Sequence, residues 1–233
     1  MTRQQKTDEL LTRFRVVQVL SEKNGCRVIR VRHRVLGRDM ILHSLPTAVP
    51  AYETLCRIRF DHLPEVYDVF TLDDGMIVLE EYVDGMTVAQ MLEVGLFSRR
   101  QASRIVADVC DALTVLHREA IVHRDVKPEN VLIGSDGRTV LIDFNASRRI
   151  SGAEHDTVFM GTLGYAPPEQ FGITESDART DVYAVGVLYN VMLTGLHPTQ
   201  RLAGGKAGRI VRKCTQTNSA DRFQTARELA DAL

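Results

Sequence analysis

The sequence His123-Arg124-Asp125-Val126-Lys127-Pro128-Glu129-Asn130 concentrates the most informative polar residues of the chain. It contains a carboxylate, an ammonium and an amide, and a second carboxylate, Asp143, follows beyond a short apolar hairpin. Asp125 can accept a proton from an attacking hydroxyl, and Lys127 can neutralise a phosphoryl group in transfer. Asn130 and Asp143 offer the hard oxygen ligands that Mg²⁺ prefers. Any one such residue is usually just solvated, but the spacing of the set favours a metal-nucleotide site.

This spacing resembles the catalytic loop and the metal-binding motif of the protein kinases. Lysine stands two positions and asparagine five positions after Asp125, and Asp143-Phe144 lies past a predicted strand pair. A lysine at position 127 is the form seen in serine/threonine kinases, which implies hydroxyl rather than phenol acceptors. The resemblance implies that Asp125 and Lys127 are catalytic and that Asn130 and Asp143 bind Mg²⁺.

The second half of the chain extends the resemblance. The stretch 161–169 is similar to the end of a kinase activation segment, with Pro-Pro-Glu where Ala-Pro-Glu is usual. The family pattern implies that Asp181 supports the catalytic loop and that Arg222 pairs with Glu169. Thr157 lies where such kinases are often phosphorylated. Other hydroxyl residues of this region are Ser147, Ser151 and Thr162.

In the first half, the resemblance departs from the family at the positions that handle phosphate. Between Leu20 and Val28, side chains occupy space that glycines would leave for a phosphate group. The replacing residues are Ser21, Lys23 and Cys26. The nucleotide lysine of the third strand is replaced by His43, a shorter side chain that is mostly neutral at pH 7 unless Glu53 raises its pKa.

The remaining nucleotide contacts are also implied by the resemblance. Glu53 is, by spacing, the helix glutamate that normally pairs with the missing lysine. Glu80 occupies the gatekeeper position, where its carboxylate should narrow the pocket or bind His43. Glu81 and Val83 offer backbone groups to an adenine. The apolar nucleotide contacts are Leu20, Val28, Ile41 and Leu132. The basic residues that can partly replace the lysine are Lys23, Arg27 and Arg30. Asn145 stands at the position of the metal-motif glycine, and asparagine tolerates positive φ.

The hydrophobic pattern predicts five strands and one helix, a connector and then a mainly helical part. The resemblance implies that these form an α+β, bilobal, protein-kinase-like fold, with one kinase domain over residues 1–233. The smaller lobe, about 10–81, should hold a five-stranded antiparallel sheet and one short helix, after a polar start that frays. A hinge at about 82–85 leads to a larger, mainly helical lobe over 86–233. The predicted strands are 14–20, 26–32, 40–45, 66–72, 76–81, 131–133 and 140–142, and the predicted helices are 52–59, 98–118, 181–193, 208–215 and 225–233.

Composition limits the other possibilities. With 44% hydrophobic and 25% charged residues, the 233-residue chain is typical of a soluble globular protein. Its net charge of −1 gives no bulk reason to bind nucleic acid or a membrane surface. The four cysteines form no close pair, which argues against zinc ligation and a disulfide framework. We expect a cytoplasmic protein whose partner is a protein substrate or a regulatory protein; the sequence indicates no oligomeric state.

Three functions remain open at this stage. The first is an ATP-dependent serine/threonine protein kinase of reduced activity, with ATP and Mg²⁺ as cofactors. The second is a pseudokinase that acts as a scaffold or regulatory binding module, which the departures at His43 and in the glycine loop favour. The third, a small-molecule phosphotransferase, is disfavoured because the stretch from Asp143 to Glu169 resembles a platform for peptide substrates.

Overall fold

The computed structural model describes residues 1–150 and 176–233. These residues form two compact units. The first unit comprises Met1–Phe60 and Pro64–Val83, and the second comprises Asp61–Leu63 and the chain from Asp84 onward. The predictions made for the stretch 161–169, for Thr157 and its neighbours Ser151 and Thr162, and for the Glu169 to Arg222 ion pair lie outside the described residues.

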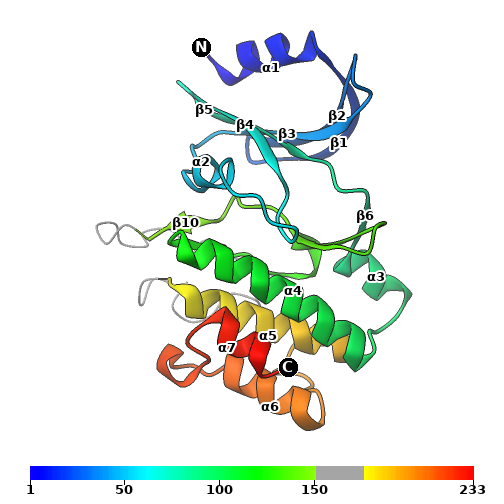
Figure 1. Ribbon diagram of the computed structural model, residues 1–233, viewed down its shortest axis with the longest axis vertical. Helices are drawn as coiled ribbons and strands as arrows, with labels where there is room; N and C mark the ends of the chain where they lie inside the picture. The colour runs from blue at the N-terminus through cyan, green and yellow to red at the C-terminus, as the bar shows by residue number, and fades with distance from the viewer. Residues whose placement is uncertain (151–175) are drawn as a thin grey trace. The chain divides into compact units, whose positions relative to one another are not determined.

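The first unit is built on a five-stranded antiparallel sheet with the order β1-β2-β3-β5-β4 (Figure 1). All five predicted strands are present. Asn24 and Gly25, both at positive φ, connect the first two strands in the left-handed turn that suits the twist of a hairpin. The strands are β1 (Phe14–Lys23), β2 (Cys26–His33), β3 (Asp39–Leu45), β4 (Val66–Leu72) and β5 (Gly75–Glu81).

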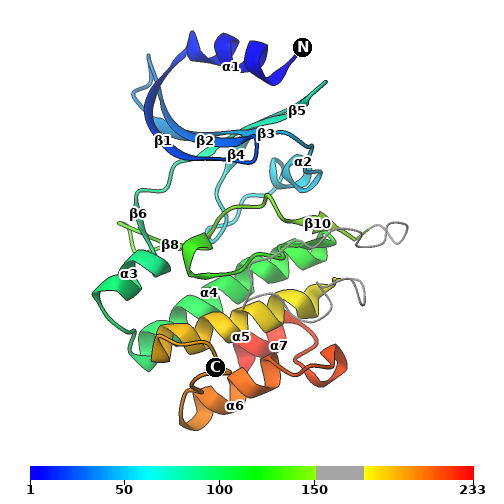
Figure 2. The ribbon, with the colours of Figure 1, turned by 180° about the vertical axis from the view of Figure 1, so that it is seen from behind.

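Two helices lie on opposite faces of this sheet (Figures 1 and 2). The expected frayed start is instead a helix, α1 (Arg3–Leu11), which begins with a capping box between Thr2 and Gln5. Its Leu10 is buried in a cluster with residues of β1, β2, β3 and β5. The other face carries α2 (Ala51–Leu55), which is shorter than the predicted helix over 52–59. Strand alternation therefore places Leu42 on the α1 side and His43 on the α2 side.

The second unit is mainly helical. The predicted helix after Ser98 is α4 (Arg99–Arg118), and Ser98 forms a capping box with Gln101. It runs beside α5 (Ala178–Thr194), which in turn packs against α6 (Gly205–Cys214), while α7 (Ala226–Asp231) packs against α4 and α5 (Figure 1). The helix α5 carries eleven buried residues, which makes it the centre of this unit.

Short elements hold the loop that contains Asp125. The loop follows β7 (Ile121–Val122), which pairs with β10 (Arg148–Arg149). It ends in the 3₁₀ turn η1 (Pro128–Asn130), which leads into β8 (Val131–Gly134). The strand β8 pairs with β6 (Gly85–Thr87) and β9 (Thr139–Leu141). The remaining short elements are α3 (Val88–Val94) and η3 (Ser219–Asp221).

The four cysteines are free thiols, as expected, and two of them, Cys110 and Cys214, are buried in the second unit. Burial raises the pKa of Cys214 to about 12, so this side chain is a neutral core residue at neutral pH. Over the described ranges, no helix is long and apolar enough to cross a membrane.

Candidate phosphoryl-transfer site

The structure brings Asp125, Lys127 and Asn130 together in the second unit. The Lys127 Nζ lies 2.7 Å from the Asp125 Oδ2. The Asn130 Nδ2 donates to the same Oδ2 at 3.0 Å and to the Asp125 backbone oxygen at 2.8 Å. The carboxylate of Asp125 is thus held in one orientation by a cation and an amide, as a positioned proton acceptor must be.

The backbone of the loop is fixed from within the unit by Asp181 of α5, as the resemblance implied. This side chain is fully buried. Its two oxygens accept hydrogen bonds from the backbone nitrogens of His123 (3.0 Å) and Arg124 (2.8 Å) and from the His117 Nε2 (2.7 Å). Burial opposes ionisation of Asp181, but the hydrogen bond and charge of His117, with the loop's own groups, keep its pKa below the usual value.

His123 links the loop to the strand pair that follows it. Its Nδ1 accepts the Asp125 backbone N–H at 3.3 Å, and its Nε2 donates to the Ile142 backbone oxygen at 3.2 Å. The ring also meets Phe144 edge to face, with ring centroids 5.1 Å apart. Complete burial lowers the pKa of His123, so the imidazole is neutral and serves as a structural connector at neutral pH.

Asp143 stands at the start of the predicted metal motif with φ +67°, and Arg124 has φ +69°. Non-glycine residues rarely adopt this conformation, and such residues cluster at functional sites. The Asp143 Oδ1 accepts the Asn145 backbone N–H at 3.2 Å. Asn145, which stands at the position of the family's glycine, is not among the described residues with positive φ.

The donor set of Asn130 and Asp143 suits Mg²⁺. Asn130 uses its amide nitrogen on Asp125, which leaves its carbonyl oxygen as the atom able to bind a cation. No cluster of three or more His, Cys, Asp or Glu side chains able to hold a metal occurs among the described residues. Mg²⁺ is usually held by one or two carboxylates together with phosphate oxygens and water, so two protein ligands are sufficient.

In the first unit, His43 and Glu80 form a buried pair, which confirms that the gatekeeper carboxylate binds the imidazole. The His43 Nε2 lies 2.8 Å from the Glu80 Oε1, and each residue is only 4% exposed. Within the described chain, the Glu80 Oε2 is buried without a hydrogen-bond partner. The imidazole of His43, the residue that stands in place of the nucleotide lysine, is therefore bound by Glu80 of the neighbouring strand β5.

Glu53 does not take the role that its spacing implied. It is exposed, and its Oε1 accepts a hydrogen bond from the Thr71 Oγ1 at 3.3 Å. The preceding residue, Tyr52, is fully buried and packs against His43 with ring centroids 6.0 Å apart. Neighbouring residues on a helix point about 100° apart. Because Tyr52 faces the sheet, Glu53 is turned toward β4 and solvent.

The basic residues of the first hairpin also differ from expectation. Arg30 shares the His43 face of the sheet, but its guanidinium is bound to Asp39 and lies over the Tyr82 ring at 3.9 Å. Arg27 pairs with Ser44 in the register and therefore faces α1, where it lies 3.6 Å from a Glu22 oxygen. Lys23 is exposed. Arg30 and Arg27 are thus occupied elsewhere in the unit.

The other predicted nucleotide contacts fall in both units. Leu20 is 46% exposed, Val28 is half-buried and Ile41 is buried, all in the first unit. Glu81 is also in the first unit, where its backbone N–H donates to the Glu65 oxygen at 2.8 Å. The buried Val83 ends the first unit. Leu132 lies half-buried on β8 of the second unit.

His117 is the site residue that the sequence did not single out. It lies in the last turn of α4 and bonds to Asp181, a residue 64 positions away. In the sequence, His117 is marked only by its place at a helix end shortly before the loop of Asp125. Histidines are common at helix ends, so this pattern does not indicate a role.

Comparisons with known proteins agree with this geometry. The protein kinase domain family model matches residues 46–231. A probable serine/threonine-protein kinase, pknA2 of Bifidobacterium longum, is 30% identical over 203 residues, which cover 80% of this chain and 27% of that protein. The serine/threonine-protein kinase PknB of Mycobacterium leprae is 33% identical over 179 residues, which cover 65% of this chain and 29% of PknB. This chain thus spans less than a third of these relatives.

The crystal structure of the PknI kinase domain of Mycobacterium tuberculosis superimposes with a TM-score of 0.72 at 25% sequence identity, covering 94% of each chain. This match supports the bilobal kinase fold predicted from the sequence. The family match covers the catalytic loop and the two proposed metal ligands. The chain belongs to the protein kinase domain family, and its similarity is to bacterial serine/threonine members.

Proposed function

We propose that this chain is an ATP-dependent serine/threonine protein kinase that works on the magnesium complex of ATP. The observation that carries the proposal is the set of Asp125, Lys127 and Asn130, in which the Lys127 Nζ and the Asn130 Nδ2 both lie within 3.0 Å of the Asp125 Oδ2. A pure scaffold has no physical need for a carboxylate that is positioned by both a cation and an amide. Asp143, with its left-handed backbone, supplies the second metal ligand.

The chemistry assigned to these residues is phosphoryl transfer. Asp125 accepts the proton of the substrate hydroxyl as its oxygen forms a bond to the γ-phosphorus and the bond from that phosphorus to the ADP oxygen breaks. Lys127 neutralises charge on the transferring group. Asn130 and Asp143 hold Mg²⁺, which when bound neutralises the charge of the phosphate oxygens.

The first unit supports a reduced rate. The ion pair of Lys with the helix Glu that kinases use to position ATP phosphates is replaced by the buried pair of His43 and Glu80. Loss of one preorganised contact to developing charge typically lowers a rate by about 10²–10³. This loss leaves substantial catalysis, because the loop around Asp125 retains its geometry.

Phosphate transfer from radiolabelled ATP to serine and threonine tests this proposal. Wild type should label itself or a general acceptor protein in a Mg²⁺-dependent reaction, and Asp125→Asn should abolish the label. Asp231→Asn is the matched control, because Asp231 is an exposed aspartate of α7 that pairs only with Arg227 among the described residues. Equal labelling by wild type and Asp125→Asn would exclude Asp125 as the proton acceptor.

The second candidate is a regulatory binding module, and the buried pair of His43 and Glu80 favours it. If these side chains close the pocket, nucleotide does not bind and the unit acts through its surface. Thermal unfolding with and without Mg-ATP separates the two functions. A kinase that binds nucleotide is stabilised by an amount that grows with the logarithm of the ligand concentration, whereas a closed module shows no shift.

Domain organisation, partners and location belong to the same proposal. We propose a single kinase domain over residues 1–233, with an N-lobe at about 10–81, a hinge at about 82–85 and a C-lobe at about 86–233. Its partner is a protein substrate or a regulatory protein. Because ATP is a cytoplasmic metabolite, we propose that the domain works in the cytoplasm.

A further inference from the structure

A cavity of about 240 Å³ lies in the second unit, formed by α5, the loop that follows it, and α6. None of its lining residues belongs to the catalytic loop. It is lined by Tyr183, His197, Pro198, Thr199, Leu202, Arg212 and Thr215. This volume is below the range of about 300–1,000 Å³ that holds drug-sized ligands. The cavity is suited to one side chain or one small group.

His197 lines this cavity and has a buried ring nitrogen, Nε2. Its Nδ1 accepts the Thr199 backbone N–H at 3.2 Å and lies 2.7 Å from the Thr199 Oγ1. In a neutral imidazole, one nitrogen accepts and the other carries the proton, so the proton of His197 is on Nε2. Within the described chain, this Nε2 is buried and has no hydrogen-bond partner. A buried donor in this state favours a ligand with an acceptor atom.

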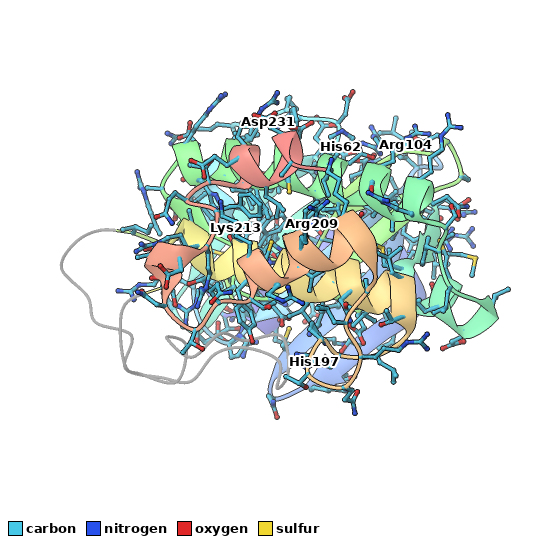
Figure 3. The ribbon with its side chains drawn as sticks, turned by 90° about the horizontal axis from the view of Figure 1, so that it is seen from below. His62, Arg104, His197, Arg209, Lys213 and Asp231 are labelled. Carbon is cyan, nitrogen blue, oxygen red and sulfur yellow. The ribbon has the colours of Figure 1, made fainter. Side chains whose placement is uncertain are left out.

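Arg212 adds a guanidinium to the same cavity. It is exposed, and no carboxylate of the described residues forms an ion pair with it. The helix that carries it, α6, has four basic residues and no acidic residue in Gly205–Cys214. Figure 3 shows two of the others, Arg209 and Lys213, on this helix at the underside of the unit. The cavity therefore opens beside a positively charged helix.

The charge of α6 exceeds what the helix itself requires. Cations in the last turn are favourable to the helix dipole, which accounts for Arg212 and Lys213. Lys206 donates to the Leu233 backbone oxygen at 2.6 Å, and Lys213 lies over the Phe223 ring at 4.2 Å. Arg209 lies outside the last turn, and neither the helix dipole nor a contact of this kind among the described residues accounts for it. It stands three or four positions from each other cation, a spacing at which like charges destabilise a helix.

We propose that this cavity is a docking pocket for a phosphorylated side chain of a protein segment. Arg212 would bind the phosphate oxygens with its planar fork of N–H groups, and the His197 Nε2–H would donate a further hydrogen bond. A phosphoserine or phosphothreonine carries about −1.5 to −2 charges and three strong acceptor oxygens at pH 7. That charge is complementary to the Arg212 guanidinium, which lines the cavity on a helix that also carries Lys206, Arg209 and Lys213.

Other anionic partners fit the surface less well. The exposed large hydrophobic residues of the described chain include none from α6, so this helix lacks the apolar residues that would insert into a membrane. The chain has a net charge of −1 rather than the strongly basic character typical of nucleic-acid-binding domains. The cavity is also a small local feature of about 240 Å³, whereas a nucleic-acid backbone needs an extended basic track.

The test uses a neutral five-residue peptide with a central phosphothreonine, titrated into the whole chain without nucleotide. Binding is followed by NMR at the ring of His197 and the Nε–H of Arg212. We expect both signals to shift with the same dissociation constant, and Arg212→Ala to weaken binding at least tenfold. Arg212→Lys should keep the positive charge but lose most of the affinity for the peptide, because lysine lacks the planar fork of N–H groups. Arg104→Ala is the matched control, because Arg104 is an exposed arginine of α4 that lies outside the cavity (Figure 3).

Each alternative gives a distinct result. Unchanged binding in Arg212→Ala, or equal losses in Arg212→Ala and Arg104→Ala, would overturn the site. A peptide with glutamate in place of phosphothreonine that binds equally well would show an acidic-segment pocket instead. Inorganic phosphate or a short oligonucleotide that binds as tightly as the peptide would show a general anion site. Because no nucleotide is present, these results are independent of the proposed phosphoryl transfer.

Discussion

Replacing Asp181 by asparagine should destabilise the second unit, because this buried carboxylate accepts hydrogen bonds from three donors. The donors are the backbone nitrogens of His123 and Arg124 and the His117 Nε2. An asparagine offers only one oxygen. If that oxygen keeps the bond to the Arg124 N–H, the new NH₂ group faces the His123 N–H, and two donors meet in a site without solvent.

The magnitude follows from the number of donors left without an acceptor. The His123 N–H and the His117 Nε2 share the Asp181 Oδ2, so both lose their acceptor in Asp181→Asn. At roughly 1–3 kcal/mol for each unsatisfied buried donor, this change should lower the free energy of unfolding by roughly 2–6 kcal/mol. Asp181→Ala leaves all three donors without an acceptor and should cost roughly 3–9 kcal/mol by the same rule. Asp111→Asn is the control. The Asp111 side chain is 42% exposed and lies 3.6 Å from Arg227, and surface changes of this kind stay within about 0.5 kcal/mol.

Urea unfolding followed by circular dichroism measures these differences. The pH dependence gives a second, independent check. The pKa of Asp181 is lower in the folded chain than in the unfolded chain, so its ionisation stabilises the fold above the unfolded pKa, and this contribution is lost as pH falls through the folded value. Wild type should lose this stability in acid below about pH 4, and Asp181→Asn should lack that component. An Asp181→Asn variant as stable as Asp111→Asn would show that the Asp181 carboxylate is not needed to hold these donors.

The remaining predictions concern packing, metal binding and modification. Gly186→Ala should lower the free energy of unfolding by roughly 1–3 kcal/mol, because a Cβ there would lie 2.3 Å from the Cys214 Cβ; Gly95→Ala, with no atom within 4 Å, should melt like wild type. Asp143→Asn should weaken the thermal shift caused by ATP with Mg²⁺ but not that caused by ATP with EDTA, and equal losses in both would exclude a metal ligand. Mass spectrometry after incubation with Mg-ATP should find phosphate at Thr157 that is absent in Asp125→Asn; phosphate only at other residues would contradict that assignment.

The elements with a clear period were predictable from the sequence, and the elements held by distant contacts were not. The five strands of the first unit alternate in hydrophobicity, and α4 begins at a recognisable cap, Ser98. The helix α1 is mostly polar and short, so it depends on its capping box and on the burial of Leu10 against the sheet. The strands β7 and β10 have two residues each and therefore show no period.

The same division applies to the candidate site. Asp125, Lys127 and Asn130 lie within six consecutive residues, so their spacing alone predicts that they meet. The partner of His43 depends on strand register. His43 pairs with Val78 across β3 and β5, which makes Glu80 its diagonal neighbour on the same face. Spacing identified Glu53 as the helix glutamate but could not show which face of the short α2 turns toward the sheet.

We expect the loop of Asp125 to be competent for phosphoryl transfer and the His43 position to limit nucleotide handling. The most direct test is the steady-state rate of phosphate transfer from radiolabelled Mg-ATP by His43→Lys compared with wild type, with Asp125→Asn added to each as the background. A lysine can form an ion pair with Glu80 and offer an ammonium to the nucleotide phosphates. His43→Lys should raise kcat/KM for ATP at least tenfold, and Asp125→Asn should remove this gain. No gain would contradict this expectation and would show that the first unit closes the pocket by other means.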